Sequence, residues 1–162
     1  MKKQVYIETS VISYQTAWPS RDVIQLAKQA ATKQWWRDHL PLCDVFVSEL
    51  VDREIKRGDV DAIRRRQEAV AMLARMEITD EVNELAMRLL QAHALPEVAK
   101  DDATHVALAT VHEMDILLTW NCKHIANGIM MPKILATIEK SNYEPPLILT
   151  PAILLESMGE LP

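Results

Sequence analysis

The sequence predicts an α/β fold, a three-layer αβα sandwich around a mainly parallel central sheet. From end to end, short β-branched runs alternate with longer segments of helical periodicity, and this alternation is typical of parallel strands joined by helices. The chain has 162 residues, of which 49% are hydrophobic, and a chain of this size can bury a core without disulfides or a structural metal. No linker, repeat or low-complexity tract divides it, so we expect one domain over residues 1–162.

The predicted strands are short and mostly apolar, which is typical of strands that helices cover on both faces. They span residues 5–7, 45–47, 76–78, 116–119 and 147–149. Ligands of such sheets bind beyond the carboxyl ends of the strands, at the point where the strand order reverses. We therefore expect a functional site where the polar residues that follow the strands come together.

Capping residues, glycine and prolines mark where the intervening helices begin and end. We expect the first long helix to run from an N-cap at Ser20 to about Leu40. A second helix leaves Ser48 and stops at Gly58. Further helices are predicted to begin at Asp59, at Thr79, at Asp101 or Asp102, at Pro132 (to about Lys140) and after Thr150.

Acidic and hydroxyl side chains follow the first two predicted strands. Glu8 comes directly after the first strand, and Thr9 and Ser10 follow it. After the second strand, Glu49 and Glu54 lie five residues apart, which corresponds to about 140° around a helix. Only one of these two acids can easily face a shared site.

A third acid and further polar groups belong to the last part of the chain. Asp102 lies at the start of a helix, where capping is a competing interpretation because the helix dipole favours an acid there. The fourth strand ends at Thr119, and Asn121 and His124 follow it. Carboxylates that meet at strand ends repel one another unless a cation or a proton holds them together. Oxygen ligands select Mg²⁺ or Mn²⁺, ions that suit hydrolysis of a phosphodiester.

The composition excludes several other classes of protein. The three glycines are too scattered for a nucleotide-binding loop, and a net charge of -5 argues against a general nucleic-acid coat. No apolar run reaches the length of a membrane span, and the N-terminus lacks the apolar core of a signal peptide. Since the two cysteines also lack CxxC spacing, the expected location is the cytoplasm.

Four blocks of the sequence, taken in order, resemble the PIN-domain family of ribonucleases, and in particular the VapC-like toxins of bacterial and archaeal toxin–antitoxin pairs. The blocks are residues 6–10, 47–55, 102–109 and 117–124. By this resemblance, Glu8 stands where the family usually has its first Asp. Glu54 and Asp102 match the second and third acids, and Asn121 falls where a fourth acid or an Asn is found.

The resemblance implies a PIN-like fold and a metal-dependent endoribonuclease that acts as the toxin of a type II toxin–antitoxin pair. One or two Mg²⁺ or Mn²⁺ ions would be held by Glu8, Glu54 and Asp102. Asn121 and Thr9 would orient the attacking water or the scissile phosphate. The substrate-positioning hydroxyls would be those of Thr9, Ser10 and Thr119. The implied partners are an RNA substrate, a second copy of the chain and a small cognate antitoxin.

One alternative interpretation stays open, and a second lacks a residue that it requires. Glu8 in place of an Asp, and Asn121 in place of an acid, favour a catalytically weakened PIN module that acts through protein–protein binding. A receiver-like signalling domain also gathers acids at strand ends. It requires a Lys before a proline after the last strand, and the segment from Leu149 to Pro151 has none.

The only cluster of basic residues in the sequence, and a pair of adjacent tryptophans, each have two interpretations. Together with Arg53, Lys56 and Arg57, the run of Arg64, Arg65 and Arg66 forms either a solvated helix face or a flank of the site that holds RNA phosphates. Trp35 and Trp36 either pack in the core or contact a partner protein.

A zinc site can also be imagined from the residues His105, His112, Cys122 and His124. Their spacing fits no established zinc pattern. We expect His105 instead to pack beside the acidic cleft near Asp102, or to bond a backbone carbonyl.

Overall fold

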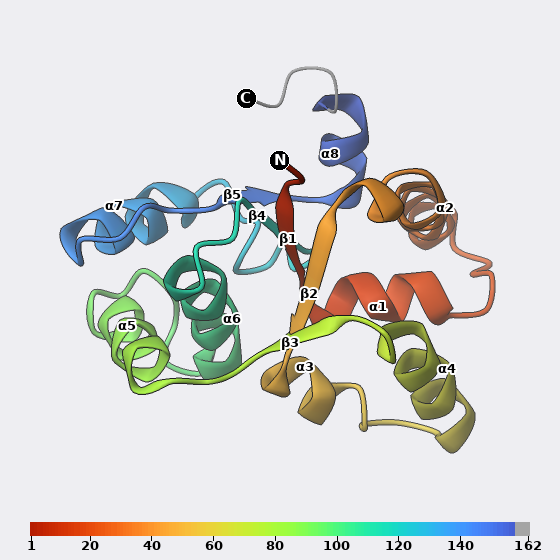
Figure 1. The fold of residues 1–162 in the computed structure, drawn as a ribbon, viewed down its shortest axis with the longest axis horizontal. Coiled ribbons are helices and arrows are strands. Elements are labelled where there is room, and N and C mark those ends of the chain that lie inside the picture. The colour runs from red at the N-terminus through yellow and green to blue at the C-terminus, as the bar shows by residue number, and fades with distance from the viewer. Residues whose placement is uncertain (158–162) are drawn as a thin grey trace.

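Five parallel strands form the central sheet in the order β3-β2-β1-β4-β5 (Figure 1). The computed structural model describes residues 1–157. The strands are β1 (Gln4–Ile7), β2 (Asp44–Ser48), β3 (Ala74–Met76), β4 (Ile116–Leu118) and β5 (Leu147–Leu149). Every pairing between neighbours is parallel, so the predicted parallel sheet is confirmed.

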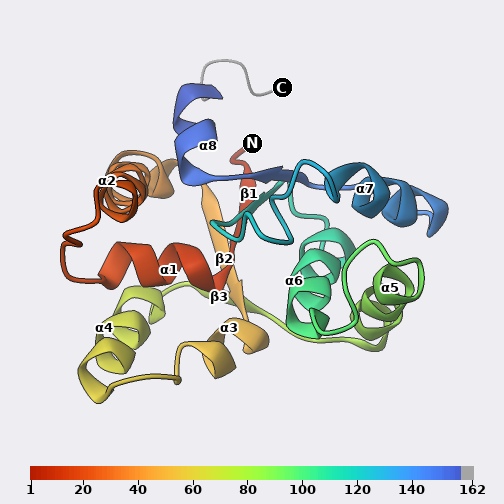
Figure 2. The same cartoon turned by 180° about the vertical axis from the view of Figure 1, so that it is seen from behind.

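Helices cover both faces of this sheet, which confirms the three-layer sandwich. The helices are α1 (Thr9–Thr16), α2 (Val23–Asp38), α3 (Glu49–Glu54), α4 (Val60–Val70), α5 (Asp80–Gln91), α6 (Lys100–Val111), α7 (Met131–Lys140) and α8 (Pro151–Ser157), with a 3-10 turn η1 at Leu40–Leu42. Figures 1 and 2 show α5, α6 and α7 on one side of the sheet, and α1, α2 and α4 on the other. Helix α8 packs beside α2. None of the helices in residues 1–157 combines the length and apolar character that crossing a membrane requires.

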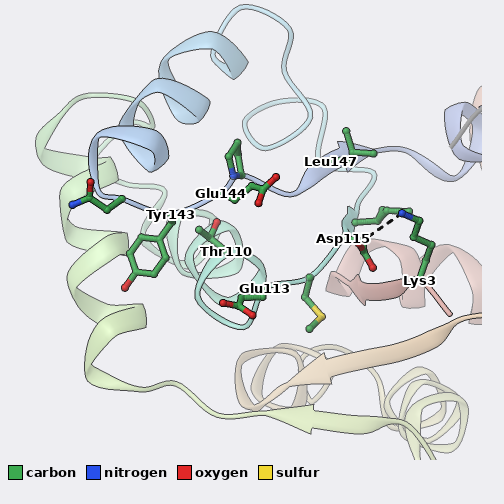
Figure 3. A pocket seen from close by; sticks show the side chains of 11 residues that line it. Lys3, Thr110, Glu113, Asp115, Tyr143, Glu144 and Leu147 are labelled. Carbon is green, nitrogen blue, oxygen red and sulfur yellow. Dashed lines mark ion pairs between the residues drawn. The ribbon is translucent and has the colours of Figure 1, made fainter. Parts of the chain in front are cut away.

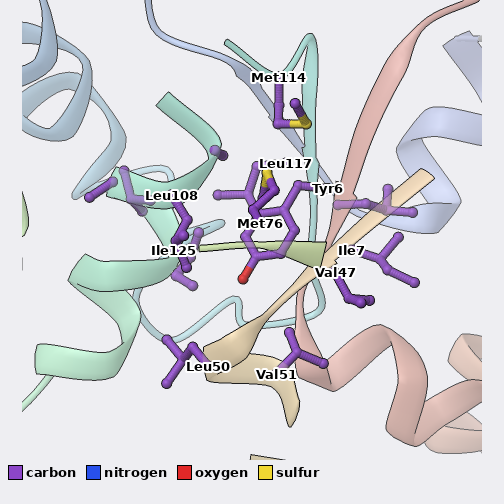
Figure 4. Close-up of a cluster of buried hydrophobic side chains, with 14 of the residues drawn as sticks. Tyr6, Ile7, Val47, Leu50, Val51, Met76, Leu108, Met114, Leu117 and Ile125 are labelled. Atoms are coloured by element: carbon purple, nitrogen blue, oxygen red, sulfur yellow. The ribbon is translucent and has the colours of Figure 1, made fainter. Parts of the chain in front are cut away.

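The core lies between the sheet and its helices. All the side chains of β4, and Val5, Tyr6 and Ile7 of β1, are buried, as expected for central parallel strands. Figure 4 shows Tyr6 and Leu117 of these two strands together within the core cluster. Trp35 is fully buried, which confirms its core role, and the half-buried Trp36 packs against the same core.

Several element boundaries differ from the predictions. Helix α1 was not expected, because its sequence is rich in β-branched and polar residues that favour helices weakly. It forms because the Glu8 side chain caps it by accepting from Ser10 N. Helix α2 begins after Asp22, whose side chain accepts from Gln25 N, and not after Ser20.

The other corrections concern β3 and the ends of three helices. Strand β3 lies two residues earlier than predicted, because Met76 pairs with Ser48 at its end. Helix α3 stops at Glu54, well before Gly58, which has a φ of 105°. Helix α6 begins at Lys100 after Ala99, which provides no side-chain cap, so Asp101 and Asp102 lie in its first turn. In α7, Pro132 is the second residue.

The order of the strands defines where a ligand site belongs. From β1 the chain moves to β2 on one side, whereas β4 pairs with β1 on the other side. The strand order therefore reverses between β1 and β4, and ligands of such sheets bind at the carboxyl ends of these strands. Glu8 follows β1 and Thr119 follows β4 at this point.

Candidate functional site

Glu8 is the central carboxylate of this strand edge. Its side chain is almost fully buried, with 5% of the residue exposed. Its Oε2 accepts hydrogen bonds from Thr119 Oγ1 at 2.8 Å, from Ser10 N at 3.1 Å and from the Ser10 hydroxyl. The other oxygen, Oε1, lies 3.8 Å from His105 Nε2. The two hydroxyls thus orient the carboxylate, and Oε1 faces the remaining site residues.

Glu54, at the end of α3, is the second carboxylate of the site. Its Oε1 lies 2.5 Å from His105 Nε2 and accepts from Thr9 Oγ1 at 3.0 Å. Glu49 points elsewhere, since its Oε2 accepts from Ile78 N at 2.9 Å. The helical rotation between the two acids therefore brings Glu54 to the site and leaves Glu49 outside it.

His105 lies between the two carboxylates and is fully buried. Its Nδ1 shares a hydrogen bond of 2.6 Å with the Tyr6 hydroxyl, which in turn lies 2.8 Å from Ser48 Oγ. Among residues 1–157 its ring bonds no backbone carbonyl, in contrast to one of the two expectations from the sequence. Ligand atoms of Glu8, Glu54 and His105 all lie within 4.8 Å of one another. Sequence reasoning placed His105 beside the cleft but did not include it in this group.

The protonation of this group follows from burial and neighbouring charge. Burial by itself lowers the pKa of His105, but the hydrogen bond to Glu54 and the charges of Glu8, Glu54 and Asp102 outweigh it and raise the pKa above its ordinary value. For Glu54, burial raises the pKa, and the bonds from His105 and Thr9 more than offset this and lower it. A protonated His105 donates from both ring nitrogens, to Glu54 and to Tyr6.

A second carboxylate set, separate from Glu8, Glu54 and His105, consists of Asp102 in the first turn of α6, Asn121 and His124. Asp102 Oδ1 accepts from Asn121 Nδ2 at 2.9 Å, and its Oδ2 lies 2.6 Å from His124 Nδ1. Asn121 Oδ1 accepts from His124 N at 3.0 Å, and Asn121 N donates to Thr119 Oγ1 at 2.9 Å. Asp102 is not one of the three residues grouped within 4.8 Å. It acts on that group through its charge, which raises the pKa of His105.

The arginines of α4 are engaged within the chain. Arg64 bonds Asp61 at 2.8 Å and Glu68 at 2.9 Å. Arg65 contacts Asp61 and donates to Thr16 O, at the end of α1 that points away from Glu8. Arg66 donates to two backbone carbonyls, those of Ala62 and Arg57. These contacts hold the three guanidinium groups against α4 and its neighbours, and of the three only Arg64 is exposed.

The four residues of the imagined zinc site do not meet in the structure. His112 Nε2 bonds the carbonyl of Glu77 at 2.9 Å. His105 and His124 belong to the two different carboxylate sets described above, and Cys122 is exposed. Within residues 1–157, the group of side chains with ligand atoms this close together is Glu8, Glu54 and His105.

The donors of this group fit a divalent cation. Two carboxylates that converge in a buried setting carry repelling negative charges, which a cation neutralises. Carboxylate oxygens suit Mg²⁺ and Mn²⁺, and an imidazole nitrogen beside them is accepted more readily by Mn²⁺. Glu8 and Glu54 are therefore the residues that would hold such an ion.

Pockets in the structure are distributed over both ends of the sheet. A pocket of about 630 Å³, drawn in Figure 3, lies near Lys3 and Asp115, which precede β1 and β4. It is therefore at the opposite end from Glu8. A smaller pocket of about 290 Å³ is lined by Asp102 and His124, and so opens beside the second carboxylate set.

Comparison with known proteins identifies the fold. No protein-family model matches the sequence, and no curated protein matches it significantly. The structure is similar to the crystal structure of VapC20 from Mycobacterium tuberculosis, a Sarcin-Ricin loop cleaving toxin, with a TM-score of 0.57 and 20% identity over 76% of this chain and 95% of that chain. It is also similar to VapBC2 from Rickettsia felis bound to a DNA fragment from their promoter, with a TM-score of 0.53 and 10% identity over 91% of this chain and 98% of that chain. The chain therefore has the PIN-domain fold of VapC toxins.

Proposed function

We propose that the chain is a metal-dependent endoribonuclease that hydrolyses RNA phosphodiester bonds, and that it serves in the cytoplasm as the toxin of a type II toxin–antitoxin pair. The observation that carries this proposal is the convergence of Glu8 and Glu54 at the carboxyl ends of parallel strands, within 4.8 Å of each other. The fold shared with VapC20, which is a Sarcin-Ricin loop cleaving toxin, supports the choice of RNA as the substrate.

In this proposal each site residue has a defined role. Glu8 and Glu54 hold Mg²⁺ or Mn²⁺, and a bound ion of this kind supplies an activated water and neutralises charge on the scissile phosphate. Thr9 orients Glu54, since its hydroxyl donates to Oε1. Ser10 and Thr119 hold Glu8 in the same way.

Asp102 and His124 line a pocket of about 290 Å³. Asp102 is fixed from two sides, by Asn121 and by His124. As the third residue proposed to hold the metal, it would complete the negative charge of the site. Asn121 orients Asp102 and contributes no charge of its own.

A small antitoxin protein and a second copy of the chain are the proposed protein partners. The similarity to VapBC2, which was crystallised with promoter DNA, supports a partnership of this type.

A cleavage assay tests the proposed reaction. The purified chain, separated from any bound antitoxin, is incubated with mixed cellular RNA in Mg²⁺, in Mn²⁺ and in EDTA. We expect cleavage with the metals and none with EDTA. Glu54→Gln and Asp102→Asn are expected to abolish it, whereas Glu49→Gln, on the same helix as Glu54 but outside the site, is the matched control and is expected to cleave normally. Absence of cleavage with Mn²⁺ supplied would overturn the proposal.

A second candidate function is a PIN module that acts through protein–protein binding with little catalysis. The observation that favours it is that Asp102 bonds Asn121 and His124 and stays outside the group of Glu8, Glu54 and His105. A folded chain that binds a protein partner but leaves RNA intact under all three conditions would establish this alternative.

A further inference from the structure

Lys28, on α2, has its ammonium group over two aromatic rings beside the candidate site. Its Nζ is 5.7 Å from the centre of the Tyr14 ring and 5.5 Å from the centre of the Trp120 ring. The two rings are themselves 5.7 Å apart with an interplanar angle of 57°. Both rings therefore attract the ammonium group from their faces and hold it in place.

The charge of Lys28 is not neutralised by an acid. Among residues 1–157, no carboxylate lies within ion-pair distance of Lys28 Nζ, whereas the guanidinium of Arg64 pairs with both Asp61 and Glu68. A cation held over the faces of aromatic rings keeps its remaining N–H groups available for an anion. Lys28 is therefore better able than Arg64 to bind a phosphate.

This cluster is directly connected to the candidate site. Trp120 N donates to Ser10 Oγ at 2.8 Å, and the Ser10 hydroxyl donates to Glu8. Tyr14 lies four residues after Ser10 on α1 and so on the same face of that helix. Trp120 is fixed at its other end as well, because its Nε1 donates to Thr32 Oγ1 at 2.8 Å. These hydrogen bonds hold Trp120, over whose ring Lys28 lies, next to the residues that contact Glu8.

We propose that Lys28, held by Tyr14 and Trp120, is a positioning residue that binds a backbone phosphate of single-stranded RNA next to the scissile bond. This inference rests on the proposed ribonuclease function. An acidic metal site repels a polyanion unless a cation lies near it, and Lys28 is a cation that contacts through Trp120 and Ser10 connect to Glu8. The aromatic rings offer faces on which the adjacent base stacks.

Steady-state cleavage kinetics of the whole chain test this role. The substrate is a random-sequence oligoribonucleotide with a fluorophore and a quencher, in Mn²⁺, at several salt concentrations. Lys28→Met removes the charge but keeps the length of the side chain. We expect its KM to rise about three- to tenfold with kcat unchanged, and the slope of log(kcat/KM) against log[salt] to become about 0.7 less steep, because one phosphate contact is lost.

Two further variants complete the test. Lys33→Met, on the same helix but about 140° around it, is the matched control and is expected to behave as the unsubstituted chain. Lys28→Arg keeps the charge and is expected to keep KM and the salt slope. If the unsubstituted chain cleaves the probe and Lys28→Met shows the same KM and salt slope, the role of Lys28 is overturned while the ribonuclease function stands. If the unsubstituted chain does not cleave, both proposals fail.

Discussion

Nε2 of His105 lies 2.5 Å from Oε1 of Glu54. Both atoms belong to the group of side chains that we propose as the metal-binding site. His105 has 1% of its side chain exposed and Glu54 17%. In the metal-free chain, the protonated imidazole therefore does part of what a cation does, since it neutralises Glu54 and reduces the repulsion from Glu8. This relationship makes the stability of the site depend on His105, on pH and on metal.

Removal of His105 is expected to destabilise the metal-free chain. His105→Leu deletes the hydrogen bonds to Glu54 and Tyr6 and leaves a carboxylate without its cationic partner, which costs about 2–3 kcal/mol of unfolding free energy. Urea unfolding in EDTA measures this loss.

The Tm of the same variant is expected to respond more strongly to metal. Without the imidazolium, Glu8 and Glu54 repel each other, so Mn²⁺ is expected to raise the Tm of His105→Leu by more than it raises that of the unsubstituted chain. A Tm that responds equally to Mn²⁺ in both proteins would show that His105 and the metal do not act on the same charges.

The contribution of this pair to stability is expected to depend on pH. The pKa of His105 is raised on folding, so its contribution is complete below the ordinary value of 6.5 and is lost as pH rises through the raised pKa. The pKa of Glu54 is lowered, so its contribution is present above the ordinary value of 4.5 and is lost as pH falls through the lowered pKa. The pair thus stabilises the chain most between about pH 4.5 and 6.5.

Urea unfolding in EDTA from pH 5 to pH 9 checks this prediction. The difference in unfolding free energy between the unsubstituted chain and His105→Leu should be largest near pH 5 to 6 and should shrink at higher pH. A difference that stays constant over this range would mean that the His105 proton does not contribute.

The location of the site could be predicted from the sequence, because it depends on local features. Glu8 follows a strand, helical rotation allows only one of Glu49 and Glu54 to face the site, and the resemblance to the PIN-domain family selects Glu54. Parallel sheets bring the ends of such strands together. These rules need no knowledge of side-chain packing. They do not say which groups pair once the elements are docked.

Which site residues pair with one another could not be predicted, because the pairing depends on how the elements pack together. His105 reaches Glu54 only because α6 packs near α3, and Asp102 turns to His124 because the loop after β4 folds back onto α6. Lys28 was missed because its partners are Tyr14 and Trp120, from two other parts of the chain. The available signal was the lack of an acid three or four residues away from Lys28 on its helix.

Glu8 has two roles that different substitutions separate. It caps α1 through Ser10 N and, in our proposal, holds a metal. Glu8→Gln keeps an acceptor for Ser10 but removes the charge, so we expect little change in unfolding free energy and weaker Mn²⁺ binding by calorimetry. Glu8→Ala also removes the cap and is expected to cost about 1 kcal/mol more. Equal Mn²⁺ affinity in Glu8→Gln would exclude Glu8 as a ligand.

The amide of Asn121 keeps the second carboxylate set less negative than a fourth acid would. Asn121→Asp exchanges the Nδ2 donor to Asp102 for a second carboxylate at 2.9 Å, and like charges at this distance repel. We expect this variant to lose about 1–2 kcal/mol of unfolding free energy in EDTA. Because Mn²⁺ neutralises the added charge, the loss should be smaller with the metal present, and the Mn²⁺ affinity should rise. Asn83→Asp, on α5 and exposed, is the control for an added charge. If Asn121→Asp binds Mn²⁺ no more tightly than this control, Asp102 and position 121 lie outside the reach of the metal.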